Sequence, residues 1–313
     1  MVSMLARRLC SRVCLPVAVT LLAGCNTVLL NPSGDIASQQ ARLLVVSTLL
    51  MLIIIVPVIL LTVLFAWRYR KNNTSATYSP EWDHSTMLEL IIWGGPLLII
   101  IALGLITWIS THTLDPYRPL SRIDATHPVT ADTKTLTVEV VALDWKWLFI
   151  YPELGIASVN ELAAPVDMPI RFKITASSVM NSFYIPALAG QIYAMPGMET
   201  SMHAVINQAG DYDGFSANYS GAGFSDMRFK FHGMTPENFE RWVQRTKNSP
   251  LMLHRADYSQ LTEPTQRDPV KLFGHVEDNL FHAIVNRCIA EKSVCIDATM
   301  NAAGHAAMHH AAP

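Results

Sequence analysis

Two long uncharged segments dominate the first part of the chain. Residues 43–67 and 90–111 carry no charged side chain and are almost entirely apolar. An α-helix rises about 1.5 Å per residue, so either segment is long enough to cross a hydrocarbon core of about 30 Å. The pattern therefore predicts two transmembrane helices, over 43–67 and 86–111. The alternative, two helices buried in a soluble protein, does not account for uncharged segments of this length.

The loop between the two segments indicates their orientation. Residues 68–85 begin with Arg68-Tyr69-Arg70-Lys71. Basic residues next to a membrane span favour the cytoplasmic side. We therefore expect 68–85 to be cytoplasmic and both ends of the chain to be periplasmic.

The start of the second segment contains an ionisable residue, Glu89. Thr86 followed three positions later by Glu89 matches a capping box, which satisfies free amides at a helix N-terminus. The spacing therefore favours helix capping as the role of Glu89. A second interpretation is a proton-accepting carboxylate at the mouth of a pathway, because ionisable groups near membrane depth are often functional.

The N-terminal residues resemble an export signal. Arg7, Arg8 and Arg12 precede a short apolar segment, 13–22, and then Leu22-Ala23-Gly24-Cys25. This resembles the bacterial lipobox and predicts a lipoprotein signal peptide over 1–24, lipidation of Cys25 and a periplasmic segment over 25–42. An ordinary signal peptide cleaved nearby is the alternative. The lipobox predicts a mature N-terminus held on the outer face of the bacterial inner membrane by the acyl chains on Cys25.

Beyond the second span the pattern changes to short alternating segments. Residues rich in β-branched and aromatic side chains are separated by Gly, Pro and Asp, which is typical of a β-sandwich or barrel. We expect this domain to cover 130–234. The predicted strands are 135–141, 144–151, 169–175, 181–186, 200–206 and 210–214.

The last part of the chain predicts a helical arm over 235–300. Thr235-Pro236-Glu237 combines a cap residue, a proline in the first turn and an acidic side chain, which is typical of a helix start. Cys288 and Cys295 could form a disulfide in an oxidising periplasm, although spacing alone does not show that the sulfurs meet. The His- and Ala-rich tail, 301–313, could bind a metal but is more often disordered.

Composition excludes one class of function. The chain has 313 residues and a net charge of −2, with 50% hydrophobic and 15% charged residues. A general nucleic-acid binder is strongly basic, so we expect no nucleic-acid partner. The apolar composition agrees instead with a protein in contact with the lipid bilayer.

A small loop, 214–227, has the spacing of a metal site without its ligands. Ser216 and Ser220 lie four residues apart, Phe224 follows four later and Met227 three after that. Two cysteines and a histidine at the first three positions would bind a soft metal. Hydroxyls that do not ionise and a phenyl ring offer copper no anionic ligand. The loop therefore predicts no bound metal.

The chain resembles subunit II of the haem–copper terminal oxidases in its combination of an export signal, two spans, a β-domain and this loop. That family's outer domain is a cupredoxin-like sandwich, which in cytochrome c oxidases holds the binuclear copper A centre. The resemblance implies a membrane protein with a two-helix hairpin, an all-β cupredoxin-like sandwich and a C-terminal helical arm. The positions matching copper A ligands are Asn181, Ser216, Asn218, Ser220, Phe224 and Met227, and only Met227 keeps the family's residue.

The changed positions resemble the quinol-oxidising branch, the cytochrome bo- or ba-type ubiquinol oxidases, which lack copper A. Residues 140–153 and Asn218-Tyr219-Ser220-Gly221 agree with that branch. The resemblance implies an accessory, non-redox subunit of a proton-pumping ubiquinol:oxygen oxidoreductase. This chain would hold no cofactor, whereas subunit I would hold the haems and copper B. Its partners would be subunit I, other oxidase subunits, lipid and the ubiquinol bound by the complex.

The same resemblance implies roles for three further residues. Glu89 matches a glutamate at the entrance of a proton path. Trp145 and Trp147 match a tryptophan pair beside copper A, and without copper they would pack and contact subunit I. Two alternatives remain at this point: a cytochrome c oxidase subunit II that does bind copper, and a non-enzymatic envelope lipoprotein.

Overall fold

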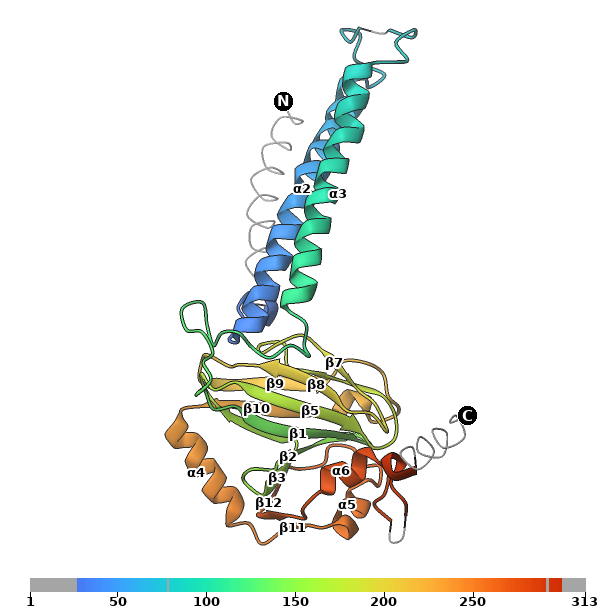
Figure 1. Cartoon of the computed structure of the whole chain (residues 1–313). Helices are drawn as coiled ribbons and strands as arrows, with labels where there is room; N and C mark the ends of the chain where they lie inside the picture. Colours follow the sequence, from blue (N-terminus) through green and yellow to red (C-terminus); the bar gives the residue numbers. More distant parts are fainter. Residues whose placement is uncertain (1–26, 78, 291–292, 300–313) are drawn as a thin grey trace, which may run out of the picture.

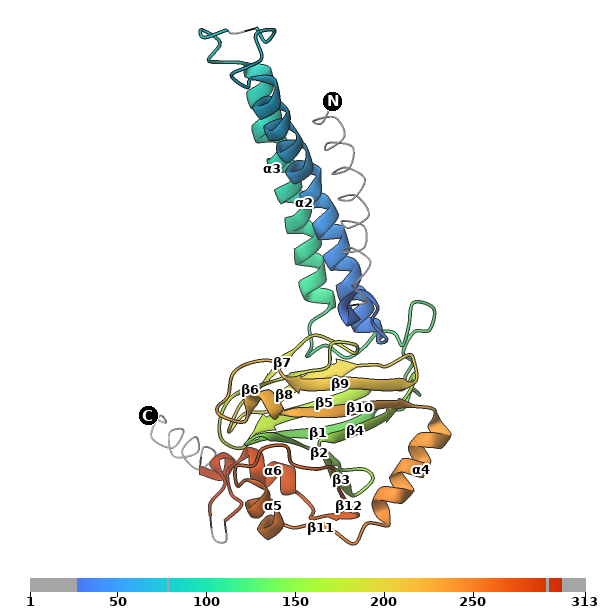
Figure 2. The same cartoon turned by 180° about the vertical axis from the view of Figure 1, so that it is seen from behind.

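A helical hairpin stands on a two-sheet β-sandwich, and a C-terminal arm covers the far side of the sandwich (Figure 1). The computed structural model describes residues 27–77, 79–290 and 293–299. The predicted signal peptide, the lipidated Cys25 and the His-rich tail lie outside the described residues. Seen from behind, in Figure 2, the hairpin and the arm again lie at opposite ends of the sandwich.

The hairpin consists of α2 (Asp35–Arg68) and α3 (Thr86–Thr113), preceded by a short 3₁₀ turn, η1 (Val28–Leu30). Both helices are long and apolar enough to cross a membrane, and their apolar side chains are exposed in the isolated chain. The predicted span 43–67 lies inside α2, which begins eight residues earlier. The polar first turns of α2 are helical because they pack on the sandwich, which a count of apolar residues does not reveal.

The sandwich contains two mixed sheets. The first has the strand order β12-β3-β2-β1-β5-β8, and the second has the order β4-β10-β9-β6-β7. In both sheets a parallel pair, β1 with β5 and β10 with β4, interrupts otherwise antiparallel pairing. The strands are β1 (Leu136–Leu143), β2 (Lys146–Tyr151), β3 (Ile156–Val159), β4 (Glu161–Pro165), β5 (Ile170–Ala176), β6 (Asn181–Tyr184), β7 (Ile192–Ala194), β8 (Thr200–Ala204), β9 (Gly210–Ser216) and β10 (Arg228–Met234).

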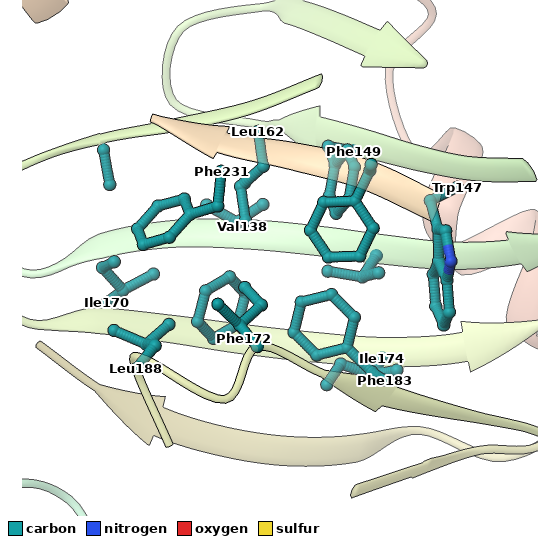
Figure 3. Packing of buried hydrophobic residues seen from close by; sticks show 14 of the residues in the cluster. Val138, Trp147, Phe149, Leu162, Ile170, Phe172, Ile174, Phe183, Leu188 and Phe231 are labelled. Carbon is teal, nitrogen blue, oxygen red and sulfur yellow. The ribbon is translucent and has the colours of Figure 1, made fainter. Parts of the chain in front are cut away.

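Aromatic side chains fill the space between the two sheets. Figure 3 shows Trp147 at one end of a row that continues through Phe149, Phe183 and Phe172. The rings of Phe183 and Phe229 stack with an interplanar angle of 2° and a centroid distance of 5.5 Å. Buried aromatic pairs of this kind add about 0.5–1.5 kcal/mol beyond the area that they bury. This cluster lies beside the loop that follows β9.

The arm mixes helices with short strands. Its elements are α4 (Pro236–Lys247), β11 (Met252–Leu253), α5 (Arg255–Leu261), β12 (Lys271–Phe273), β13 (His275–Val276) and α6 (Leu280–Val285). The predicted helix start is confirmed, because the Thr235 side chain accepts a hydrogen bond from the backbone N–H of Asn238. The arm is not purely helical, since β12 pairs with β3 and extends the first sheet.

The outer face of the first sheet and the arm share a second hydrophobic core. The side chains that meet there come from β1, β2 and β3 of the sheet and from β11, α5, β12, β13 and α6 of the arm. At the other end of the arm, Trp242 and Arg245 of α4 both donate hydrogen bonds to the Glu161 carboxylate, at 2.6 and 2.7 Å. The arm is therefore packed on the sandwich as part of the same domain.

One carboxylate beneath the arm makes stability depend on pH. Glu139 lies on β1 opposite Lys173 of β5 and faces a cavity whose other wall is the arm. Burial raises the pKa of the Glu139 carboxyl from 4.5 to about 7, with Lys173 lowering it and Glu199 raising it. Between these values the folded state holds a proton that the unfolded state has released. Stability is therefore lost as the pH rises through this window.

Glu139→Gln is expected to remove that loss. Relative to wild type, the melting temperature of Glu139→Gln should be higher at pH 8 than at pH 5. Thermal unfolding of the full chain in detergent measures both values. Glu240→Gln, a change at an exposed carboxylate on α4, is the matched control. A difference of the same size at both pH values would contradict the assignment.

Candidate functional site

The loop between Ser216 and Met227 joins the paired strands β9 and β10 and rests on β6. Its base is closed by two backbone hydrogen bonds: Ser216 N–H donates to Met227 O at 3.2 Å, and Ala217 N–H donates to Ser182 O at 3.0 Å. A short 3₁₀ turn, η2 (Phe224–Asp226), ends the loop. This arrangement brings Asn181, on β6, next to Ser216, although the two are 35 residues apart.

Two of the positions that resemble copper ligands bond directly to each other. The Ser216 hydroxyl donates to the Asn181 side-chain oxygen at 2.9 Å, and both side chains are buried. The Asn181 amide in turn donates to Val179 O at 3.2 Å. A neutral hydroxyl and a neutral amide thus satisfy each other where metal ligands would have to converge on a third atom.

The third and fourth positions, Asn218 and Ser220, are held by the backbone. The Asn218 amide donates to Met180 O at 3.2 Å and to Tyr219 O at 3.3 Å. The backbone oxygen of Ser220 accepts a hydrogen bond from the Trp145 indole at 3.4 Å. Both side chains are half-buried, and neither belongs to an ionisable type.

The last two positions are occupied by packing residues. Phe224 is half-buried, and its ring meets that of Tyr219 edge-on at 5.9 Å. Met227 is fully buried and belongs to the same apolar cluster as Phe183. The thioether that remains from the ligand pattern is therefore part of the core between the sheets.

The two tryptophans of the predicted pair have different environments. Trp147 is fully buried, with ring centroids 5.3 Å from Phe183 and 5.8 Å from Phe229. Trp147 therefore packs inside the sandwich, and in the isolated chain its side chain presents no surface to a partner subunit. Trp145 is half-buried and stays a contact candidate.

Trp145 packs on two glycines of the loop. A Cβ atom at Gly223 would lie 2.6 Å from the indole ring, and one at Gly221 would lie 2.8 Å from it. Gly221 also has a φ of +130°, which L side chains rarely adopt. The indole and the loop backbone therefore lie closer together than any other residue type at these positions would allow.

Four polar atoms near the loop are buried without a hydrogen-bond partner within the described part of the chain. They are Trp147 Nε1, Ser182 Oγ, Asn218 Oδ1 and Ser220 Oγ. A buried polar atom without a partner costs about 1–3 kcal/mol. Two of these atoms, those of Asn218 and Ser220, belong to the loop itself, and the other two belong to strands β2 and β6.

The donor set at the loop does not fit copper. Its side chains offer hydroxyls, neutral amides and one buried thioether. Copper in cupredoxin-like sites is held by thiolate and imidazole, with a thioether as a weaker additional ligand. Across residues 27–77, 79–290 and 293–299 no group of three or more His, Cys, Asp or Glu side chains could hold a metal ion. No chemical step is assigned to a metal on this chain.

Glu89 lies in the first turn of α3, at the end of the hairpin farthest from the sandwich (Figure 1). The predicted capping box does not form. Thr86 is already inside the helix, so Ser85 occupies the cap position, and Ser85 makes no side-chain capping hydrogen bond. The Glu89 carboxylate instead lies 2.8 Å from Nδ1 of His84, and both side chains are exposed.

Sequence reasoning missed His84 as the neighbour of Glu89. The imidazole precedes the helix and has no place in the capping pattern, so only the turn into α3 brings it to the carboxylate. Carboxylates and imidazoles both gain and lose protons readily in proteins. The pair can therefore accept and pass protons at this end of the hairpin.

Cys288 and Cys295 form a disulfide bond, with their Cα atoms 4.8 Å apart. Arg255, at the start of α5, donates a hydrogen bond to Cys288 O at 3.2 Å and pairs with the Glu277 carboxylate at 2.9 Å. The disulfide therefore lies where the end of the arm is attached to α5.

Comparison with known proteins places these features in a family. Residues 153–233 match the family model described as the cytochrome c oxidase subunit II periplasmic domain, and residues 247–292 match the COX aromatic rich motif. The second match covers most of the arm from the end of α4 onward.

Relatives match over most of the chain. Cytochrome bo(3) ubiquinol oxidase subunit 2 of Pseudomonas putida is 49% identical over 267 residues, which cover 85% of this chain and 82% of the relative. Ubiquinol oxidase subunit 2 of Acetobacter aceti is 50% identical over 277 residues, with coverages of 87% and 88%. The Pseudomonas aeruginosa protein with the same name as the first is 48% identical, with coverages of 85% and 78%.

Proposed function

Because this chain belongs to the family of ubiquinol oxidase subunit 2, we propose that it is an accessory subunit without a redox centre of its own. The complex oxidises ubiquinol, reduces oxygen to water and pumps protons. Haems and copper B belong to the partner subunit I, and this chain supplies the membrane hairpin and the outer domain.

The observation that carries this proposal is the set of contacts made by the loop between Ser216 and Met227. Asn181 and Ser216 bond to each other, and Met227 is buried in the apolar core. A copper A centre needs thiolates and imidazoles converging on one place, and the loop offers neither. We infer that the loss of these ligands accompanies a change of electron donor from cytochrome c to quinol.

The membrane arrangement supports the same proposal. The basic residues Arg68, Arg70 and Lys71 follow α2 directly and favour a cytoplasmic loop, which leaves the sandwich in the periplasm. The predicted lipid anchor on Cys25 would lie on that periplasmic side. The hairpin would then pack in the bilayer against subunit I, with Trp145 as a contact from the outer domain.

The choice between this function and a free-standing envelope lipoprotein is tested by purification. The chain, tagged and extracted from its native membranes, is expected to carry a haem-bearing partner and to oxidise ubiquinol but not reduced cytochrome c. Haem spectra and oxygen consumption with the two donors are the readouts. A chain recovered alone from the membrane, or a complex that oxidises cytochrome c in place of ubiquinol, would contradict the proposal.

The Glu89–His84 pair supports a role in proton entry from the cytoplasm. Glu89→Gln keeps the size of the side chain and removes its proton exchange, so turnover with ubiquinol is expected to fall roughly tenfold. Oxygen consumption and proton uptake by the purified complex in vesicles measure this. Glu81→Gln changes an exposed carboxylate in the loop that precedes α3 and is the control. Equal turnover in both variants and wild type would remove Glu89 from the pathway.

A further inference from the structure

A cavity lies where the hairpin meets the sandwich. It has a volume of about 240 Å³ and is formed by the first turns of α2, the connection after α3 and the segments around Gly190 and His203. Its wall on the hairpin side is held in place by an ion pair, in which the half-buried Arg122 donates two hydrogen bonds of 2.9 Å to the buried Asp35 carboxylate. Gln39 donates a third, at 2.8 Å.

The cavity continues into a groove between the two helices. The groove has a volume of about 380 Å³, and more of its accessible lining is apolar than polar. Cavity and groove adjoin, since four residues line both of them. These are Gln40, Leu114, Asp115 and Pro116. The groove then runs along α2 and α3 past Leu43 and Thr107.

The charges in the cavity are balanced but not all paired. Asp35 and Arg122 neutralise each other. Arg118 and Asp115 form no ion pair with any side chain that the structure describes. Arg118 donates one hydrogen bond, to His112 O at 3.3 Å, and Asp115 accepts one, from Tyr117 N–H at 3.0 Å. One cationic and one anionic group therefore remain available three residues apart.

The depth of the cavity follows from the helix that leads to it. The uncharged segment of α3 ends at about Thr111, and the cavity begins at Thr113. Tyr117, which is 55% exposed, follows directly, and tyrosines favour the level of the lipid headgroups. The cavity thus lies at headgroup level, and the groove extends from it toward the hydrocarbon layer.

We propose that cavity and groove together bind one zwitterionic phospholipid. The phosphate accepts hydrogen bonds from the Arg118 guanidinium, whose planar fork suits phosphate oxygens. The headgroup ammonium lies at the Asp115 carboxylate, and one acyl chain occupies the groove between α2 and α3. A free phosphate would leave the groove and Asp115 unused, and an anionic lipid would bring a headgroup without a cation to Asp115.

Lipid binding to the intact detergent-solubilised complex tests this proposal. After delipidation, matched-chain phosphatidylethanolamine, phosphatidylglycerol or diacylglycerol is added, and retained lipid is counted by native mass spectrometry. Wild type is expected to retain phosphatidylethanolamine in preference to the other two. Arg118→Gln should weaken its retention about tenfold, because a charge-assisted bond is lost. Asp115→Asn should abolish the preference over phosphatidylglycerol.

Arg70→Gln is the control, since it removes a cation that follows the end of α2, at the opposite end of the hairpin from Asp35, and should leave retention unchanged. Both test residues are exposed, and the ubiquinol oxidase activity of each variant reports that the complex is assembled. Three results would overturn the proposal: equal retention of the three lipids, retention by Arg118→Gln at the wild-type level, or no added lipid bound because the chain's own acyl anchor fills the groove.

Discussion

Met227→Ala is expected to destabilise the outer domain by about 3 kcal/mol, and Met227→Leu by less than about 1.5 kcal/mol. Met227 is fully buried in the cluster between the sheets, so alanine leaves a cavity whereas leucine nearly conserves the volume. Chemical unfolding of the full chain in detergent, followed by tryptophan fluorescence, measures both values.

The leucine variant separates packing from metal binding. A thioether ligand has no substitute in leucine, so a ligand role predicts that leucine and alanine are equally damaging and that both change the metal content of the complex. A packing role predicts near-wild-type stability for leucine and no change in metal content. Equal damage from the two substitutions would contradict our account of this residue.

Gly214→Ala is expected to destabilise the outer domain by about 3 kcal/mol or more. A Cβ atom at Gly214, on β9, would lie 2.1 Å from the Phe229 ring. Phe229 would have to leave its stack with Phe183 and its contact with Trp147, 5.8 Å away. The loop that follows β9 would then lose the core on which it rests.

Gly210→Ala, on the same strand, is the control for this effect. There the nearest atom to an added Cβ is the Tyr212 hydroxyl at 3.3 Å, the end of a flexible side chain. We expect a cost of less than about 1 kcal/mol for this variant. Equal unfolding midpoints for the two variants would show that close packing of Phe229 on the strand is not what stabilises the site.

The sequence predicted those features that depend on local patterns. Uncharged length predicted the hairpin, and alternation predicted six of the strands, including β1 and β5, because each pattern is complete within a few residues. Strands β3, β4, β7 and β10 and the pairing of β12 with β3 were not predicted. Their structure depends on partners more than a hundred residues away in the case of β12.

The residue types at the candidate site could be read from the sequence, but the contacts that these residues make could not. Spacing and resemblance together indicated that residues 216–227 keep only Met227 of the copper ligand pattern. They could not show that Ser216 bonds to Asn181 or that Trp147 is inaccessible, because both facts arise from the packing of one sheet on the other. Likewise, His84 was missed because it reaches Glu89 only through the turn into α3.

The central claim is that the outer domain of this oxidase subunit holds no copper, and the metal content of the intact complex tests it most directly. Copper and haem are measured on the purified complex by elemental analysis, together with its near-infrared absorption. We predict copper equal to the copper B of the partner subunit and no near-infrared band of a binuclear copper centre. Additional copper that stays with this chain when the subunits are separated, together with such a band, would contradict the account.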